Sequence, residues 1–283
     1  MKKYGSSIAF WLLFLTGILV LIYPSASNDW NRVHQTRAIK DYKAVSSSMT
    51  NEKLTESMQK AEMYNEQLRH IDFPFACSEK VPGYGEILNV SGTGIMGYIH
   101  IPKIGVELPI YHTADPEILN VAAGHLQGSS FPTGGEGTHC VLSGHRGLPS
   151  AKLFSDLDKL EIGDRFQLSV LNRELVYQVD QILIVRPDQV SELSIKDGKD
   201  YCTLVTCTPY GINSHRILVR GVRTAAADEN PVCVLTEGEQ INPAKVAVFL
   251  SAPFILPLLV KDLRHGRRKR SEKIRTAGIY TEN

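Results

Sequence analysis

The sequence predicts an all-β fold: a closed β-barrel of about eight strands with short helices, an N-terminal helical arm and a transmembrane helix at each end. Short β-branched runs separated by Gly, Pro and Asp fill residues 94–224, as is typical of a barrel. A polar segment with a helical repeat precedes them, and two apolar stretches bracket the chain of 283 residues. This length allows one sizeable core with appendages.

The first apolar stretch, residues 8–23, predicts a membrane segment over residues 1–27. No charged residue occurs from Tyr4 to Asn28, and two lysines stand in front of the stretch. The segment is either a signal peptide, cut near Ser25, or a retained anchor. A buried core helix is the alternative, which the basic flank at an extreme N-terminus disfavours.

The second apolar stretch, residues 246–260, predicts a transmembrane segment over residues 244–262. It contains Pro253 and Pro257. Its fifteen residues rise about 22 Å, less than the roughly 30 Å of a hydrocarbon core, so the flanking lysines must snorkel for it to span. An amphipathic or hairpin-like membrane element is the alternative.

A basic tail, residues 263–283, follows the second stretch and predicts the topology. Lys and Arg beside a span stay in the cytoplasm. We therefore expect a multi-pass cell-membrane protein with two spans and both termini cytoplasmic, unless the N-terminal segment is cleaved. Residues 28–243 are then extracellular. A basic run can also bind nucleic acid, but next to an apolar stretch it favours a role in topology.

Between the spans, residues 28–70 predict a helical arm packed on the main domain. Apolar residues recur on one helical face: Leu54, Met58, Ala61, Tyr64 and Leu68, preceded by Ile39, Tyr42, Val45 and Met49. The next segment, residues 71–92, includes "DFPFACSEKVPGYGE", in which two prolines and two glycines break the pattern. We expect an irregular, lid-like loop there.

The barrel domain is predicted over residues 93–224, with a linker at 225–243. The predicted strands are residues 95–101, 106–111, 138–144, 164–171, 174–185, 201–207 and 216–223. Brief helical pieces are expected near residues 118–123 and 153–157. No internal repeat is evident.

Cys207 ends one predicted strand, and Arg216 begins the next, nine residues later. If these strands are antiparallel neighbours, the loop between them returns Arg216 to Cys207. A thiol with a pKa of about 8.5 is only a few per cent thiolate at neutral pH, and nearby positive charge raises that fraction. Such chemistry also needs a proton donor or acceptor, and histidine is the first choice. His145, at another strand exit, is the candidate, and His125 is its rival.

The chain has an odd number of cysteines, so in an exterior domain at least one is free or pairs with another molecule. They are Cys77, Cys140, Cys202, Cys207 and Cys233. None shows a CxxC or Cys/His spacing, so we predict no metal site. Cys202 lies five residues before Cys207 and therefore points to the opposite face of a regular strand, so it is assigned no catalytic role.

These residues lie in stretches that resemble the sortase signatures. "TLVTC" at 203–207, with Arg216 downstream, resembles TLxTC and its arginine, and "SGHR" at 143–146 resembles the sortase histidine motif. "GIMGYIHIPKIGVELPIYH", "GHLQGSSFPTGGEGTH" and "CTPYGINSHRILVRG" resemble more narrowly the class C, pilus-assembling sortases of Gram-positive bacteria. The resemblance covers most of residues 90–224 and the membrane layout.

The resemblance implies a sortase-type barrel that performs transpeptidation without a cofactor. Cys207 would attack the Thr–Gly carbonyl of an LPxTG-like sorting signal. His145 would be the acid and then the base, and Arg216 would hold the signal and stabilise the oxyanion with the backbone N–H after Cys207. Thr206 and Thr208 are the implied substrate-binding residues.

The implied partners are pilin subunits and the membrane, with no nucleic acid. In the class C family the acceptor is a lysine amine of another pilin, so the product is a polymer linked by isopeptide bonds. We expect the enzyme to act as a monomer.

A lid is a further implication, because class C sortases commonly cover the active site with an Asp-Pro-aromatic motif. This chain reads DFPF from Asp72, with one residue between the aspartate and the proline. In the lid hypothesis Asp72 pairs with Arg216, while Phe73 or Phe75 covers Cys207. An ordinary tether loop is the alternative.

Three other functions stay open from the residues. A papain-like or cell-wall cysteine peptidase would hydrolyse instead of transfer, but such chains place the cysteine before the histidine. A non-catalytic, membrane-tethered pilus scaffold does not explain why Cys207, Arg216 and His145 all fall at strand ends. A housekeeping sortase that joins proteins to peptidoglycan is disfavoured by the predicted C-terminal span.

Overall fold

The structure is a computed structural model and describes residues 2–224. Several predictions therefore lie outside the described residues: the linker at 225–243, the span at 244–262, the tail at 263–283 and Cys233.

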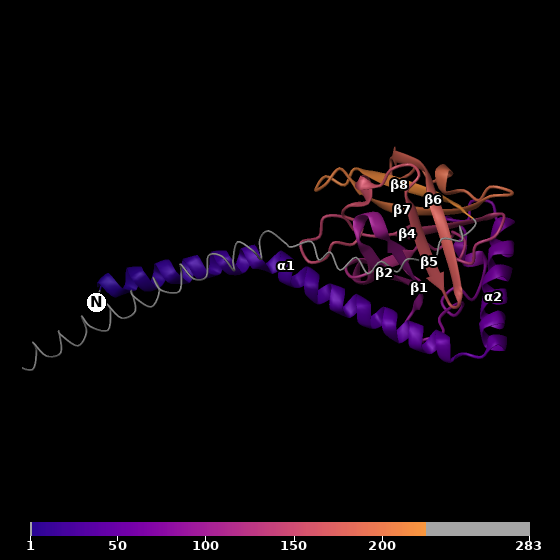
Figure 1. The fold of residues 1–283 in the computed structure, drawn as a ribbon. Coiled ribbons are helices and arrows are strands. Elements are labelled where there is room, and N and C mark those ends of the chain that lie inside the picture. The colour runs from indigo at the N-terminus through magenta and orange to yellow at the C-terminus, as the bar shows by residue number, and fades with distance from the viewer. Residues whose placement is uncertain (1, 225–283) are drawn as a thin grey trace, which may run out of the picture. The chain divides into compact units, whose positions relative to one another are not determined.

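Eight strands close into a barrel, which confirms the β-barrel part of the predicted fold class (Figure 1). They are β1 (Ile95–Ile101), β2 (Val106–Tyr111), β3 (Ala123–His125), β4 (Thr138–Ser143), β5 (Arg165–Val170), β6 (Arg173–Val185), β7 (Asp200–Thr208) and β8 (His215–Arg223). Around the barrel the order is β1-β2-β3-β4-β7-β8-β6-β5. The pairs β2–β3 and β4–β7 are parallel, and the others are antiparallel.

Seven strands match the predicted runs to within one residue at each end. The unpredicted strand is β3, which is too short to show an alternating pattern. The helical piece expected at residues 118–123 is α3 (Pro116–Leu119), and Ala123 instead pairs with Ile110 of β2. The piece expected at residues 153–157 consists of turns that lead into a 3₁₀ turn at Leu157–Lys159.

The predicted arm consists of the second part of α1 (Lys2–Ser48) and of α2 (Asn51–Arg69). Thr50 begins α2, because its hydroxyl accepts a hydrogen bond from the Lys53 N–H at 3.5 Å. The α2 face predicted from helical spacing is buried as a whole: Leu54, Met58, Ala61, Tyr64 and Leu68.

The α1 helix belongs to two units of the structure, with residues 2–26 in one and residues 27–48 in the unit that carries the barrel. From Trp11 the helix is long and apolar enough to cross a membrane. Over 18 residues of this segment the mean hydropathy is 1.5 and no residue is buried. Together with the polar arm that follows, this helix fits a membrane anchor.

Tyr42 fixes the second part of α1 to the barrel. Its hydroxyl donates to the Met96 carbonyl at 2.9 Å and accepts from the Leu171 N–H at 2.8 Å. These bonds join α1 to β1 and to the turn between β5 and β6. Burial raises the Tyr42 pKa to about 12, so the hydroxyl stays protonated and able to donate.

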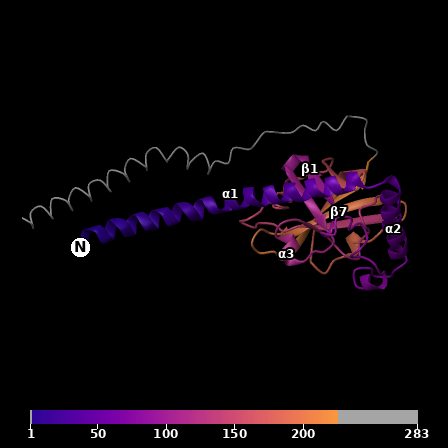
Figure 2. The same ribbon diagram turned by 90° about the horizontal axis from the view of Figure 1, so that it is seen from below.

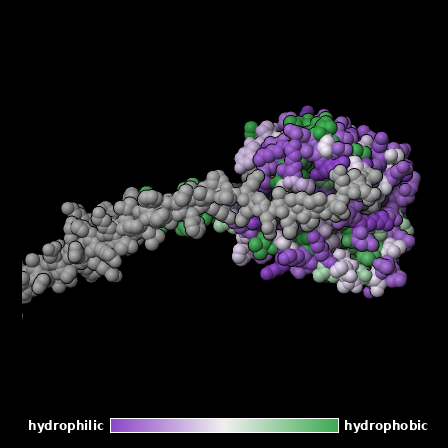
Figure 3. Space-filling model, in the orientation of Figure 1, coloured by the Kyte–Doolittle hydropathy of each residue, from purple (hydrophilic) through white to green (hydrophobic). Residues whose placement is uncertain are grey.

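The α2 helix lies beside the barrel (Figures 1 and 2), and its Arg69 guanidinium lies against Gly137, just before β4. Asn65 secures it, because its amide accepts from the Phe131 N–H at 2.7 Å and donates to the Thr133 hydroxyl at 2.9 Å. Tyr64 and Leu68 join the core cluster inside the barrel. The face of the barrel unit seen in Figure 3 is mostly hydrophilic, with small separate hydrophobic areas.

Candidate active site

The strand β7 ends at the predicted nucleophile and positions it beside an arginine. Cys207 is the register partner of Arg216 in the antiparallel pair β7–β8. Directly opposed residues of two strands place their side chains on the same face, about 5 Å apart at Cβ. The predicted approach of Arg216 to Cys207 is therefore confirmed.

The parallel pair β4–β7 brings a histidine to the other side of the cysteine. Each β4 residue pairs with the residue 62 positions later, from Thr138 with Asp200 to Ser143 with Val205. The ladder continues past β4, because the Gly144 N–H donates to the Val205 carbonyl at 3.1 Å. His145 lies 62 positions before Cys207, so the same register sets it beside the thiol.

His145 is half-buried, and burial lowers its pKa from the usual value. Its ring has no hydrogen-bond partner within residues 2–224, and its backbone carbonyl accepts from the Phe154 N–H at 3.1 Å. The neighbouring Gly144 lies against the Phe154 ring, where a Cβ would come within 2.6 Å of a ring carbon. The ring is thus free for proton transfer while its backbone is fixed.

Arg216 is held by its own loop and has no carboxylate partner in the described chain. Its Nη1 donates to the carbonyls of Asn213 and His215, each at 3.0 Å. The predicted ion pair with Asp72 is not formed: the Asp72 side chain is exposed, and Arg216 donates to backbone carbonyls instead. The remaining guanidinium donors are therefore available to a ligand.

A family model for the sortase domain matches residues 99–224. The crystal structure of sortase C1 from Streptococcus agalactiae is 48% identical and superposes with a TM-score of 0.63, covering 68% of this chain and 100% of its own. The chain belongs to the sortase family. It is therefore a cysteine transpeptidase, and a thiol between a histidine and an arginine is the arrangement such chemistry needs.

Other solved structures similar to this sortase are also class C enzymes. Sortase C of Streptococcus pneumoniae is 44% identical with a TM-score of 0.61, over 67% of this chain and 97% of its own. Sortase C of Clostridium perfringens, solved with the C-terminal cell wall sorting motif, is 42% identical with a TM-score of 0.60, over 67% and 99%.

Among curated proteins, sortase A of Bacillus anthracis is 30% identical over 60% of this chain and 80% of its own length. Sortase D of Bacillus subtilis is 33% identical over 45% of this chain, and the match spans 63% of that protein.

An apolar outer patch adjoins Cys207 on the outside of the barrel. It consists of Val141, Leu193, Val205 and Leu218. Phe75 of the loop predicted as a lid packs on this patch, whereas Phe73 is 81% exposed. The loop backbone also contacts Gly128, where a Cβ would lie 2.8 Å from the Phe75 Cα. Phe75 is therefore the aromatic side chain that covers this face.

The two threonines beside Cys207 face protein groups. Thr206 is buried, and its hydroxyl donates to the Gly144 carbonyl at 2.7 Å, just before His145. Thr208 is also buried, and its hydroxyl accepts from Arg146 at 3.4 Å. These bonds are made within the protein, and the binding of substrate by the two threonines stays a prediction. The sequence did contain a signal for the placement of Thr206. Side chains alternate along a strand, so Thr206 must face away from the side of the sheet that carries Cys207.

The other histidine and cysteine candidates lie inside the barrel. His125 is fully buried, and its Nε2–H donates to the Ser130 carbonyl at 2.9 Å while Nδ1 lies 2.8 Å from the Tyr84 hydroxyl. Cys140 and Cys202 face each other across the β4–β7 ladder and are also buried. Of the four described cysteines, only Cys77 and Cys207 are partly exposed. His125 is thus a structural residue.

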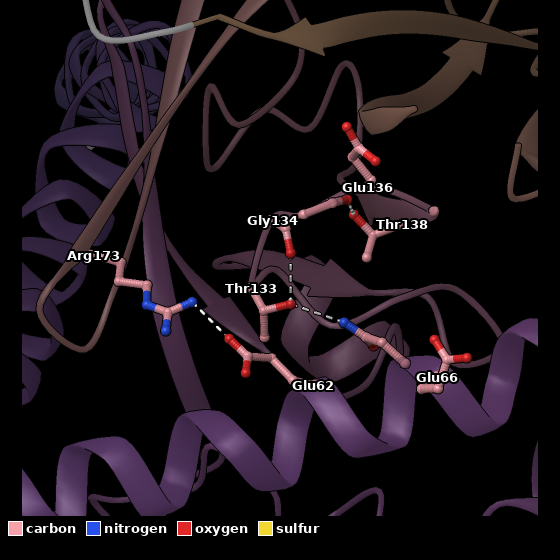
Figure 4. A pocket seen from close by; sticks show the side chains of 10 residues that line it. Glu62, Glu66, Thr133, Gly134, Glu136, Thr138 and Arg173 are labelled. Atoms are coloured by element: carbon pink, nitrogen blue, oxygen red, sulfur yellow. Dashed lines mark hydrogen bonds and ion pairs between the residues drawn. The ribbon is translucent and has the colours of Figure 1, made fainter. Parts of the chain in front are cut away.

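A cavity of about 320 Å³ lies at the opposite end of β4 and β7 and contains none of the predicted site residues. Figure 4 shows Glu62 of α2 facing Arg173 of β6 across it, and their side chains form an ion pair at 2.7 Å. Within residues 2–224 no three His, Cys, Asp or Glu side chains are grouped to hold a metal ion.

Proposed function

We propose that this sortase cleaves an LPxTG-like sorting signal on a pilin and joins the new carbonyl end to a lysine of another pilin by an isopeptide bond. The observation that carries the proposal is the register of β7, which sets His145 on one side of Cys207 and Arg216 on the other. The class C identity of its solved relatives supports a pilin as the substrate.

In the first step the Cys207 thiolate attacks the carbonyl carbon of the signal threonine. The bond from that carbon to the glycine nitrogen breaks, and His145 gives a proton to the departing amine. The product is a thioester on Cys207 and a free glycine amine. His145 suits this role because its ring is half-buried and not engaged by other described residues.

In the second step a lysine amine of the acceptor pilin attacks the thioester. His145 takes the amine proton, the carbon–sulfur bond breaks and the Cys207 thiolate is restored. Both steps pass through an oxyanion, which Arg216 stabilises with its free donors and the backbone N–H after Cys207. Thr206 contributes by holding the Gly144 carbonyl, so it positions His145 and is not itself a catalytic residue.

The outer patch is the proposed seat for the apolar residues of the signal, and Phe75 occupies it before the signal does. Leucine and proline side chains match its aliphatic surface. Residues 72–77 then act as a lid that must move. The proposal gives the Asp72 and Phe73 side chains no part in covering the site, because both are exposed.

The membrane layout completes the proposal. The apolar part of α1 anchors the chain, the stretch at 246–260 forms a second span, and the basic tail after it stays cytoplasmic. The barrel is then extracellular, where surface pilins are assembled.

Polymerisation of a pilin tests the function. The full chain in detergent is mixed with a pilin that carries an LPxTG signal, as wild type and in a Phe75→Ala background that opens the lid. We expect ladders that resist boiling in detergent and reductant, and none with Cys207→Ala. Cys77→Ala, which removes the other partly exposed thiol of residues 2–224, is the matched control and should keep the ladders.

Signal cleavage without ladders would show hydrolysis or an acceptor other than lysine. No change that depends on Cys207 would contradict the assignment of the nucleophile and leave a scaffold function.

A further inference from the structure

Arg146, the residue after His145, links three parts of the site. Its Nη2 forms an ion pair with Asp158 at 2.5 Å, and its Nη1 donates to the Thr208 hydroxyl at 3.4 Å. Asp158 lies in the 3₁₀ turn Leu157–Lys159, and Thr208 follows Cys207. One guanidinium thus spans the histidine loop, the turn that closes this loop and the end of β7.

The Arg146 side chain is only 12% exposed, and its Nε is buried without a hydrogen-bond partner. A buried donor without an acceptor costs stability. In contrast, the similarly buried Arg220, 13% exposed, uses both Nε and Nη2 on the Asp180 carboxylate. The Arg146 side chain therefore does not have the geometry of the best ion pair. We attribute its position to the two groups that it joins, Asp158 and Thr208.

Other hydrogen bonds also hold the loop that carries His145: bonds within the loop, bonds to Asn28 and Asn31 of α1, and bonds to the Thr206 and Tyr210 hydroxyls. The Phe154 N–H donates to the His145 carbonyl, and the Gly147 N–H donates to the Ser155 hydroxyl at 3.0 Å. The Tyr210 hydroxyl reaches the Gly147 carbonyl at 3.3 Å. After His145, the side-chain hydrogen bond from this loop to β7 is the one that Arg146 donates to Thr208, the residue next to Cys207.

We infer that Arg146 is a positioning residue: with Asp158 as its anchor, it braces the His145 loop against the end of β7 and keeps the histidine beside Cys207. This inference rests on the proposed function of these two residues. The planar fork of arginine can hold Asp158 and Thr208 at once, whereas the single ammonium of lysine cannot match both directions.

The test uses the full chain in detergent with an LPxTG peptide, in the Phe75→Ala background. Arg146→Met keeps the side-chain stem, Arg146→Lys keeps the charge and Asp158→Asn removes the anchor. We expect kcat for signal cleavage to fall about tenfold in Arg146→Met and Asp158→Asn, with KM within about twofold, because the signal still binds while the histidine is misplaced. Arg146→Lys should recover only part of kcat.

Amide hydrogen exchange supplies a readout that does not depend on activity. Faster exchange at Phe154 and Gly147 in Arg146→Met, with protection elsewhere retained, would show that the brace orders the loop. Arg220→Met removes an equally buried ion pair away from Cys207 and is the matched control. It should lower the unfolding midpoint and leave both kcat and the exchange of these two amides unchanged.

Unchanged exchange in the loop, or a kcat within about twofold of wild type in both Arg146→Met and Asp158→Asn, would overturn the inference. If wild type itself fails to cleave the peptide, the proposed function falls, while the exchange measurement still decides whether Arg146 braces the loop.

Discussion

The outer face of the β4–β7–β8 ladder carries a similar set of side chains at each end. At one end, the closed end, His139, Thr203 and Arg220 lie on neighbouring strands. At the other, the open end, His145 follows β4, while Cys207 and Arg216 are register partners. Each set has a histidine, a hydroxyl or thiol, and an arginine, yet their surroundings differ.

Every member of the closed end is engaged. The His139 Nδ1–H donates to the Ser194 carbonyl at 3.0 Å, and Nε2 accepts from the Thr203 hydroxyl at 2.7 Å. Arg220 pairs with Asp180 and lies 4.3 Å from the centre of the Tyr201 ring. His139 and Thr203 are each 1% exposed. Such a set holds strands together and has no group left for a substrate.

The open end has the opposite character. The His145 ring and the Cys207 thiol have no hydrogen-bond partner in the described part of the chain, and Arg216 uses only Nη1, on backbone carbonyls. All three are partly exposed. If the proposed function holds, the comparison teaches that burial and the number of hydrogen bonds already made, and not residue type, distinguish a structural cluster from a chemical one on this sheet.

We expect the largest difference in signal cleavage between variants of two β7 residues, Cys207 at the open end and Thr203 at the closed end. Cys207→Ala should lower signal cleavage at least about 10³-fold, because the variant lacks the sulfur that forms the thioester in the proposed function. Thr203→Val should keep the rate within about twofold. It should lower the free energy of unfolding by about 1–2 kcal/mol, since the His139 Nε2 loses its donor. Peptide cleavage and chemical denaturation measure the two effects, and a large rate loss in Thr203→Val would break the comparison.

The closed end should also show in the pH dependence of stability. Burial lowers the His139 pKa to about 4, below an unfolded value near 6.5. Between these values only the unfolded chain binds the proton, so stability is lost as the pH falls from about 6.5 to about 4, by about 3 kcal/mol. Denaturation at several pH values should show a shallower slope for His139→Gln than for wild type. Equal slopes would contradict the assignment.

The two arginines should differ next. Arg216→Ala should lower kcat/KM for the signal about 10²-fold, because the oxyanion loses a donor and a charge. Arg220→Met should leave kcat/KM within about twofold and lower the free energy of unfolding by about 2 kcal/mol, since Asp180 loses its partner. Steady-state kinetics beside denaturation separates the two, and equal kinetic losses would show that the closed end also serves the reaction.

The smallest effect concerns the lid. Phe75→Ala should raise the alkylation rate of Cys207 by a few-fold, because the cover on the outer patch is weakened, and deletion of residues 72–77 should raise it further, about tenfold. Phe73→Ala is the control, since Phe73 is 81% exposed, and should leave the rate unchanged. Equal rates in wild type and in the deletion variant would show that the loop is only a tether.

The barrel and the pair Cys207–Arg216 were accessible from the sequence because both depend on local patterns. Alternating runs fix the strands, and a short loop returns β8 antiparallel to β7. The place of His145 depends on the parallel pairing of β4 with β7, which no local pattern encodes. The resemblance to the sortase histidine motif pointed to His145, and the β4–β7 register explains why this histidine lies beside Cys207.

The contacts of the loop at residues 72–77 were predicted only in part. Asp72 is exposed and forms no ion pair with Arg216, whereas Phe75 packs on the outer patch, and whether the loop acts as a lid stays a prediction. Side-chain contacts within an irregular segment, such as that of Arg146 with Asp158, also leave no periodic trace in the sequence.

Trapping the acyl-enzyme tests most directly that the open end is the chemical one. The full chain with Phe75→Ala is incubated with an LPxTG peptide without any added amine, then denatured in acid, digested and analysed by mass spectrometry. We predict an acyl adduct ending in the signal threonine on Cys207 and on no other cysteine. An adduct on another cysteine, or cleavage of the peptide with no dependence on Cys207, would contradict the account.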